Sequence, residues 1–150
     1  MKTSDETVEI LNDLIEINND RIIGYERALK ELKEEDSDLK PLFLGFINQS
    51  RDLKNELGKE VQVMGGDMES GTTNRGKIYR AWMDVKAVVT GHDRHSVLAS
   101  CEFGEDAAQR AYESALKEEI LAYLNELIME QKSSLREAHD EVKSFRDELV

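Results

Sequence analysis

The stretch LNDLIEINNDRIIGYERALKEL, residues 11–32, decides the fold class, because its apolar residues recur every three or four positions. This spacing places them on one face of a helix and leaves the charged residues on the other face. The pattern begins at Val8, and Ser4 stands before it as the expected N-cap. The sequence therefore predicts an amphipathic helix from about residue 3 to residue 33.

Three more long helical segments follow. The second has Pro41 in its first turn and ends at Gly65, the third is capped by Asp93, and the fourth begins near Glu119. No segment alternates with the period of a strand, so the prediction is all-α. Because only the connection between the second and third segments is long, residues 1–150 are expected to form a single ferritin-like four-helix-bundle domain with one long crossover.

The crossover is expected to carry a short extra helix. After the loop GGDMESGTTNRG, residues 65–76, one helical face collects Ile78, Trp82, Val85 and Val89. Burial of Trp82 would fasten this helix to the bundle. The wider apolar surface, with Tyr79 and Met83, leaves room for a second copy of the chain, so a homodimer is one assembly that the pattern allows.

Charge excludes two classes of partner. The chain has 32 acidic and 20 basic residues and a formal net charge of -12. Binding to nucleic acid requires clustered Lys and Arg, and so does binding to an anionic membrane surface. The sequence shows neither a signal-peptide core nor an apolar run of membrane-spanning length, and Cys101 is its single cysteine. A cytoplasmic location is therefore expected.

Three residues are candidate metal ligands. Ferritin-like metal sites take a Glu from each of two helices and a Glu-x-x-His pair from each of the other two. Glu105 lies on the apolar stripe of the third segment, Glu102 lies at the edge of that stripe, and His139 borders the core of the fourth segment. A site for iron or manganese at these three residues is the alternative reading. The favoured reading predicts no cofactor.

The favoured reading is a structural polar layer. Arg136 stands where the metal motif needs Glu, and the second segment has no Glu-x-x-His pair. The central positions of the first two segments carry amides and hydroxyls, which are poor iron ligands. In a structural layer the buried carboxylates would find partners among His139, Asn and Gln side chains, Tyr25, Tyr112 and Arg residues at the stripe edges. His139 would hydrogen-bond to Glu105 or to a neighbouring amide, and replacement of Glu105 by Gln would be tolerated or even stabilising.

Other polar residues have simpler readings. Glu26, Glu56 and Glu60 are expected to be solvated, and the pair His92 and His95 is expected at an exposed helix start. Cys101 lies on an apolar stripe and is expected in the core. The sequence offers no Ser-His-Asp or Cys-His arrangement, so it predicts no enzyme of these classes.

The chain resembles a bacterial family of ferritin-like four-helix-bundle proteins that is catalogued as a domain of unknown function. The resemblance rests on residues 11–32, on GKIYRAWMDVKAVVTGHDRHSVLASCEFGEDAAQRAYESALKE, residues 76–118, and on REAHDEVKSFRD, residues 136–147. It implies a fold and no activity. The sequence therefore favours a non-enzymatic structural, interaction or stress-related bundle with a degenerate centre, and the alternative is a metal-binding protein of oxidative stress or metal handling.

Overall fold

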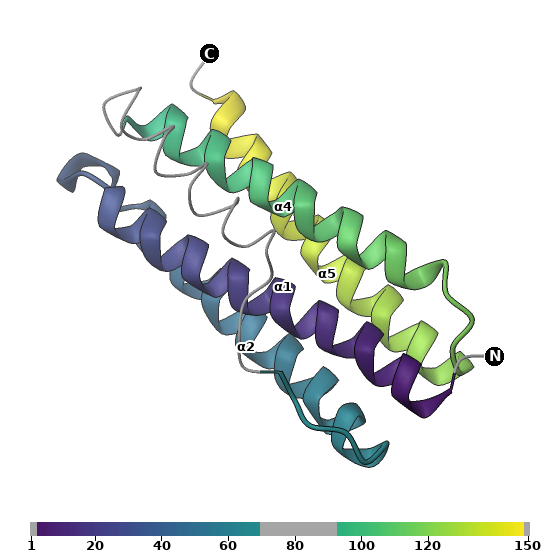
Figure 1. Ribbon diagram of the computed structural model, residues 1–150. Helices are drawn as coiled ribbons and strands as arrows, with labels where there is room; N and C mark the ends of the chain where they lie inside the picture. The colour runs from purple at the N-terminus through teal and green to yellow at the C-terminus, as the bar shows by residue number, and fades with distance from the viewer. Residues whose placement is uncertain (1–2, 70–92, 149–150) are drawn as a thin grey trace.

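The computed structural model describes residues 3–69 and 93–148, and Figure 1 shows their arrangement. The elements in this part of the chain are α1 (Ser4–Glu31), the short 3-10 helix η1 (Glu34–Asp36), α2 (Leu39–Val63), α4 (Arg94–Leu116) and α5 (Ala122–Asp147). The prediction of an all-α four-helix bundle is confirmed. The expected crossover helix, with Trp82, Tyr79 and Met83, lies outside the described residues.

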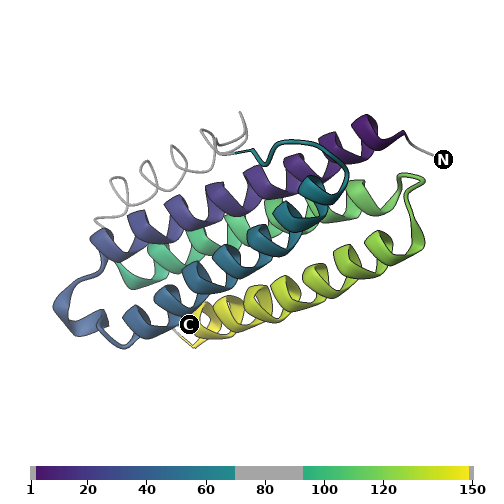
Figure 2. The same ribbon diagram turned by 90° about the horizontal axis from the view of Figure 1, so that it is seen from below.

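The helices pack as two antiparallel pairs, α1 with α2 and α4 with α5, and α1 also packs against α4 (Figures 1 and 2). Val61 near the end of α2 shares a core cluster with Ala115 near the end of α4. Phe43 and Val97, near the starts of the same two helices, share a second cluster. Because α2 and α4 therefore run parallel, the connection between them starts at one end of the bundle and finishes at the other. The predicted single long crossover follows from this topology.

The core consists of two apolar clusters at opposite ends of the bundle. One joins the first half of α1 to the second halves of α2 and α4 and to much of α5. The other joins the second half of α1 to the first halves of α2 and α4 and the last turns of α5. Buried polar side chains, among them Asn18, Arg21 and Glu105, lie between the two clusters. The layer that the sequence predicted is therefore present at mid-height.

Helix ends follow local rules, with one correction. Thr3, not Ser4, is the N-cap of α1: the Glu6 backbone N–H donates to Thr3 Oγ1 at 3.1 Å, and the Thr3 backbone N–H donates to Glu6 Oε1 at 3.1 Å. This reciprocal pair is a capping box, and only the residue three before Glu6 can form it. Asp93 caps α4 as predicted, since its side chain accepts from the Ser96 N–H. Gly65 follows α2 with a φ of 79°.

The first residues of the crossover are fastened to α1. Asn12 Nδ2 donates to the Asp67 carbonyl at 3.0 Å, and the Glu69 N–H donates to Asn12 Oδ1 at 2.9 Å. One amide side chain thus holds the chain that leaves α2 against a helix far away in the sequence.

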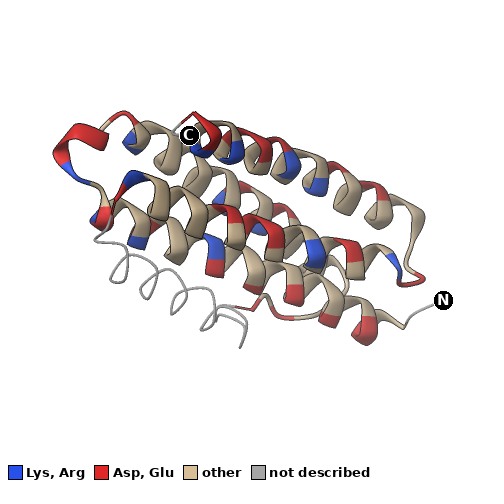
Figure 3. Cartoon of the chain, turned by 90° about the horizontal axis from the view of Figure 1, so that it is seen from above, with Lys and Arg blue, Asp and Glu red and all other residues tan. Residues whose placement is uncertain are grey.

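Along the helices Lys and Arg are interspersed among the more numerous Asp and Glu (Figure 3). None of the helices that the structure describes has an apolar stretch of the length and purity needed to cross a bilayer.

The capping box predicts different effects for two neighbouring substitutions. Thr3→Ala should lower the free energy of unfolding by about 1 kcal/mol, because it leaves the Glu6 N–H without its acceptor. Ser4→Ala, one residue along in the first turn, should change it by less than about 0.5 kcal/mol. Urea unfolding followed by circular dichroism measures both. Equal losses in the two variants would contradict the assignment of the cap.

Candidate functional site

The centre of the bundle holds a buried ion pair between Arg21 of α1 and Glu105 of α4. Arg21 Nε donates to Glu105 Oε1 at 2.5 Å and Nη2 donates to Oε2 at 3.2 Å, which is the two-pronged geometry of a guanidinium on a carboxylate. Each side chain is 1% exposed. The expected hydrogen bond between His139 and Glu105 is not formed. The partner of Glu105 is Arg21 from the neighbouring helix, and arginines were among the partners that the sequence allowed.

Arg21 is satisfied on its other edge by α2. Its Nη1 donates to the Phe46 carbonyl at 3.1 Å and to Ser50 Oγ at 2.8 Å. The guanidinium carbon also lies 5.3 Å from the centroid of the Tyr25 ring and 5.2 Å from that of Phe46. Cation–π contacts of this kind stabilise a cation that has been taken out of water. One side chain thus connects three helices.

A second network lies beside the ion pair and reaches all four helices. Asn18 Nδ2 donates to the Tyr112 hydroxyl at 2.9 Å, and that hydroxyl donates to Gln131 Oε1 at 2.7 Å. Gln131 Nε2 in turn donates to the Leu53 carbonyl at 3.1 Å. Burial raises the pKa of Tyr112. The phenol therefore acts as a neutral link that both accepts and donates.

These residues do not fit the two-metal centre of ferritin-like proteins. Such a centre gathers several carboxylates and two imidazoles. The centre described here offers one carboxylate, Glu105, and a guanidinium already neutralises it. The other central groups are the amides, hydroxyls and phenol of Asn18, Ser50, Gln131 and Tyr112. Such neutral groups are weak ligands for iron or manganese.

His139 lies away from this centre, at the boundary between α4 and α5. Its Nε2 lies 2.7 Å from Asp106 Oδ1, and its Nδ1 lies 3.0 Å from Asp140 Oδ1. The residue is 8% exposed. The structure thus gives His139 two carboxylate partners, neither of which is Glu105.

Glu102 belongs to the same boundary. Its Oε2 atom is buried and accepts no hydrogen bond of good geometry, although Arg146 Nη1 lies 2.5 Å away in an ion pair. Ligand atoms of Glu102, Asp106 and His139 all lie within 4.8 Å of one another. Two of the three residues named from the sequence, Glu102 and His139, are therefore brought together, and Asp106 replaces Glu105.

Arg21 and Asp106 were not named from the sequence, although their spacing indicates the helix face on which each lies. Arg21 stands three positions after Asn18 and four before Tyr25, so it lies on the buried stripe of α1. Asp106 stands four positions after Glu102 and therefore shares its face of α4.

Several other expectations concern single residues. Cys101 is fully buried, as expected, and burial raises the pKa of its thiol. Glu26, Glu56 and His95 are exposed, as expected, and Glu60 is partly exposed. His92 lies outside the described residues. Arg136 is exposed and pairs with Asp140 at 3.2 Å, so it does not face the centre.

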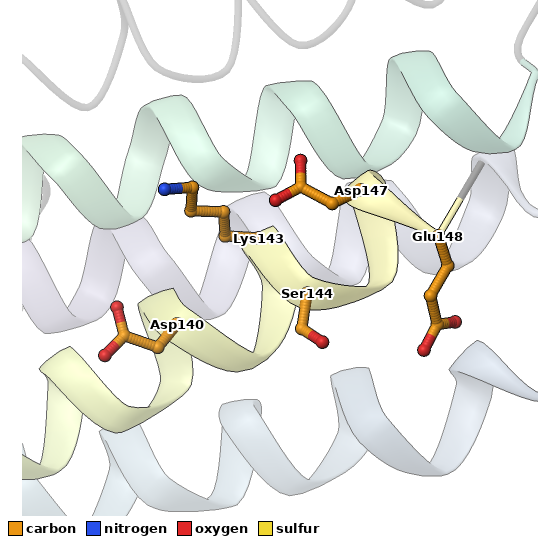
Figure 4. A pocket seen from close by; sticks show the side chains of 5 residues that line it. All are labelled: Asp140, Lys143, Ser144, Asp147 and Glu148. Atoms are coloured by element: carbon orange, nitrogen blue, oxygen red, sulfur yellow. The ribbon is translucent and has the colours of Figure 1, made fainter. Parts of the chain in front are cut away.

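An open depression of about 560 Å³ lies on the outer surface of α5, lined by Asp140, Lys143, Ser144, Asp147 and Glu148. The carboxylates of Asp140 and Asp147 lie on different turns of α5, and that of Glu148 points in another direction (Figure 4). They do not converge on a common point where a ligand would be held.

Comparisons with known proteins agree with the fold. A family model described as a domain of unknown function (DUF2383) matches residues 6–118. A solved structure of a Dps1 mutant from Mycobacterium smegmatis aligns with a TM-score of 0.80 over 95% of this chain and 96% of that chain, at 11% sequence identity. No curated protein matches the sequence. At such low identity the structural likeness shows the ferritin-like fold alone.

The central ion pair predicts a strong dependence on charge balance. Arg21→Met should cost about 3–5 kcal/mol, because it leaves the Glu105 carboxylate buried without a cation. Glu105→Gln should also destabilise, which reverses the expectation from the sequence. The double variant Arg21→Met with Glu105→Leu should lose less than Arg21→Met alone, because no charge remains buried.

Chemical denaturation of these variants provides the measurement. Arg136→Met, which removes an exposed Arg from an ion pair, is the matched control and should change stability by less than about 0.5 kcal/mol. A double variant that loses as much stability as Arg21→Met alone, or more, would show that the two charges are not coupled.

The contact between His139 and Asp140 predicts a titration effect. The hydrogen bond from His139 holds the pKa of Asp140 below its usual range. His139→Leu should therefore raise the pKa of Asp140, as measured by carboxyl NMR. Asp93, whose pKa is lowered by the Ser96 backbone N–H, is the internal control and should not change. An unchanged pKa of Asp140 would contradict the contact.

Proposed function

The chain belongs to the family described as a domain of unknown function (DUF2383), and we propose from its geometry that it is a non-enzymatic structural or interaction bundle that works through its surface. The observation that carries this proposal is the Arg21 guanidinium, which neutralises the central Glu105 carboxylate and also donates to the Phe46 carbonyl and to Ser50 Oγ. A closed, charge-balanced centre supports a scaffold and leaves no open position at which a substrate or metal ion would react.

The surface supports contacts with proteins better than contacts with nucleic acid. The net charge of -12 opposes binding to phosphate backbones. Large apolar side chains that are exposed in the described residues are Leu44, Val63, Leu121, Tyr123 and Met129. Exposed apolar side chains of this size contribute to protein interfaces. We propose a cytoplasmic location and self-association into a homodimer.

In this proposal the bundle centre is not a site for iron or manganese. A metal ion at the centre would have to displace the bidentate Arg21 from Glu105 and would leave the guanidinium buried without a counter-charge. The group of Glu102, Asp106 and His139 is a separate matter, because none of its members contacts the central pair in the hydrogen bonds and ion pairs described above.

The proposal predicts that the bundle centre is indifferent to metal ions. Protein purified without chelators should show the same change in melting temperature on addition of Fe(II) or Mn(II) in the wild type and in the double variant Arg21→Met with Glu105→Leu. A ligand that binds only the folded state raises its stability by mass action. A rise of several degrees that the double variant loses would overturn the proposal. Light scattering at micromolar concentration tests the homodimer, and a monomeric mass would contradict it.

A further inference from the structure

The boundary between α4 and α5 carries a cluster of metal-ligating side chains that the central network does not use. Glu102 and Asp106 are four residues apart in α4, so they lie one turn apart on one face. His139 of α5 is brought against them, and the three potential ligand atoms lie within 4.8 Å of one another. We propose that Glu102, Asp106 and His139 bind one divalent transition-metal ion. This inference goes beyond the proposed scaffold role and does not depend on it.

The orientation of His139 supports the proposal. A carboxylate only accepts hydrogen bonds, so the proton of the 3.0 Å contact between His139 and Asp140 resides on Nδ1. Nε2 lies 2.7 Å from Asp106 Oδ1, a contact that a proton on Nε2 bridges in the imidazolium. In the metal-bound form the ion would take the place of that proton, because a metal ligand must be the neutral imidazole. Histidine ligands of metal ions are commonly held in this way, with a carboxylate on the other ring nitrogen.

Glu102 has a partner that a metal ion would displace. Its buried Oε2 atom lies 2.5 Å from Arg146 Nη1 in an ion pair. Arg146 has another carboxylate available, because its Nη2 lies 3.0 Å from Asp147 Oδ1. A metal ion that takes over Glu102 therefore leaves Arg146 paired. The guanidinium acts as a competitor for the site, and its removal should increase metal affinity.

The donor set selects the class of ion. One imidazole nitrogen with two carboxylates suits Zn²⁺, Fe²⁺ and Mn²⁺, whereas Mg²⁺ and Ca²⁺ prefer all-oxygen sites. Zn²⁺ bonds to nitrogen and oxygen are about 2.0–2.2 Å long, so ligand atoms around one ion lie roughly 3 Å or more apart. Nε2 and Asp106 Oδ1 therefore need to separate by only a few tenths of an ångström. Among these ions Zn²⁺ should bind more tightly than Mn²⁺.

The test is a titration of untagged, chelator-treated full-length protein with Zn²⁺, followed by calorimetry. We expect one saturable site in the wild type. Asp106→Asn and His139→Gln should weaken it by at least about tenfold, and loss of the supporting carboxylate in Asp140→Asn by about 10–100-fold. Arg146→Gln should strengthen binding. Mg²⁺ at the same concentration should not compete.

Matched controls locate the site. Glu137→Gln removes an exposed carboxylate from the same helix, and His95→Gln removes an exposed imidazole, and neither should change the affinity. NMR of the wild type keeps the test independent of whether variants fold, since Zn²⁺ should shift the ring signals of His139 and not those of His95. Absence of a saturable site, or binding that survives His139→Gln and is lost in His95→Gln, would overturn the proposal.

Discussion

The pair of Arg21 and Glu105 is the constraint on which the rest of the bundle depends, because two opposite charges at 1% exposure are tolerated only if every donor and acceptor is satisfied. Arg21 donates to Glu105 on α4 and to both Phe46 and Ser50 on α2. These directional contacts hold α1 at one axial position between its neighbours. A shift of one helical turn would leave a buried charge without its partner.

The hydrogen-bond chain beside the pair extends the same constraint to α5. Tyr112 needs both Asn18 and Gln131, and Gln131 needs a backbone carbonyl of α2. The two apolar clusters on either side are non-directional and would tolerate several helix alignments. The polar layer between them favours a single alignment, so it contributes specificity where the apolar clusters contribute most of the stability.

The sequence was sufficient for the fold because the period of apolar residues determines which face of each helix is buried, and a single long connection limits the topology. It was insufficient for the polar layer. Glu105 was placed correctly in the core, and arginines were among its possible partners, but the spacing did not single out Arg21. Spacing identifies which residues share a face, but it does not tell which buried residue meets which across two helices. The pairing depends on the relative positions of α1 and α4 along the bundle, which no local pattern contains.

The same limit explains why Asp106 was missed although it adjoins Glu105. Successive residues of a helix point about 100° apart, so neighbouring carboxylates can belong to different environments. Glu105 faces α1 and meets a fixed internal cation, whereas Asp106 and Glu102 face α5 and meet an imidazole. In the first environment an arginine of the same chain neutralises the carboxylate. The second holds carboxylates around a ring nitrogen and is balanced by an arginine that has another partner. One face of α4 thus carries a carboxylate with a structural role, and another face carries carboxylates that can bind a ligand.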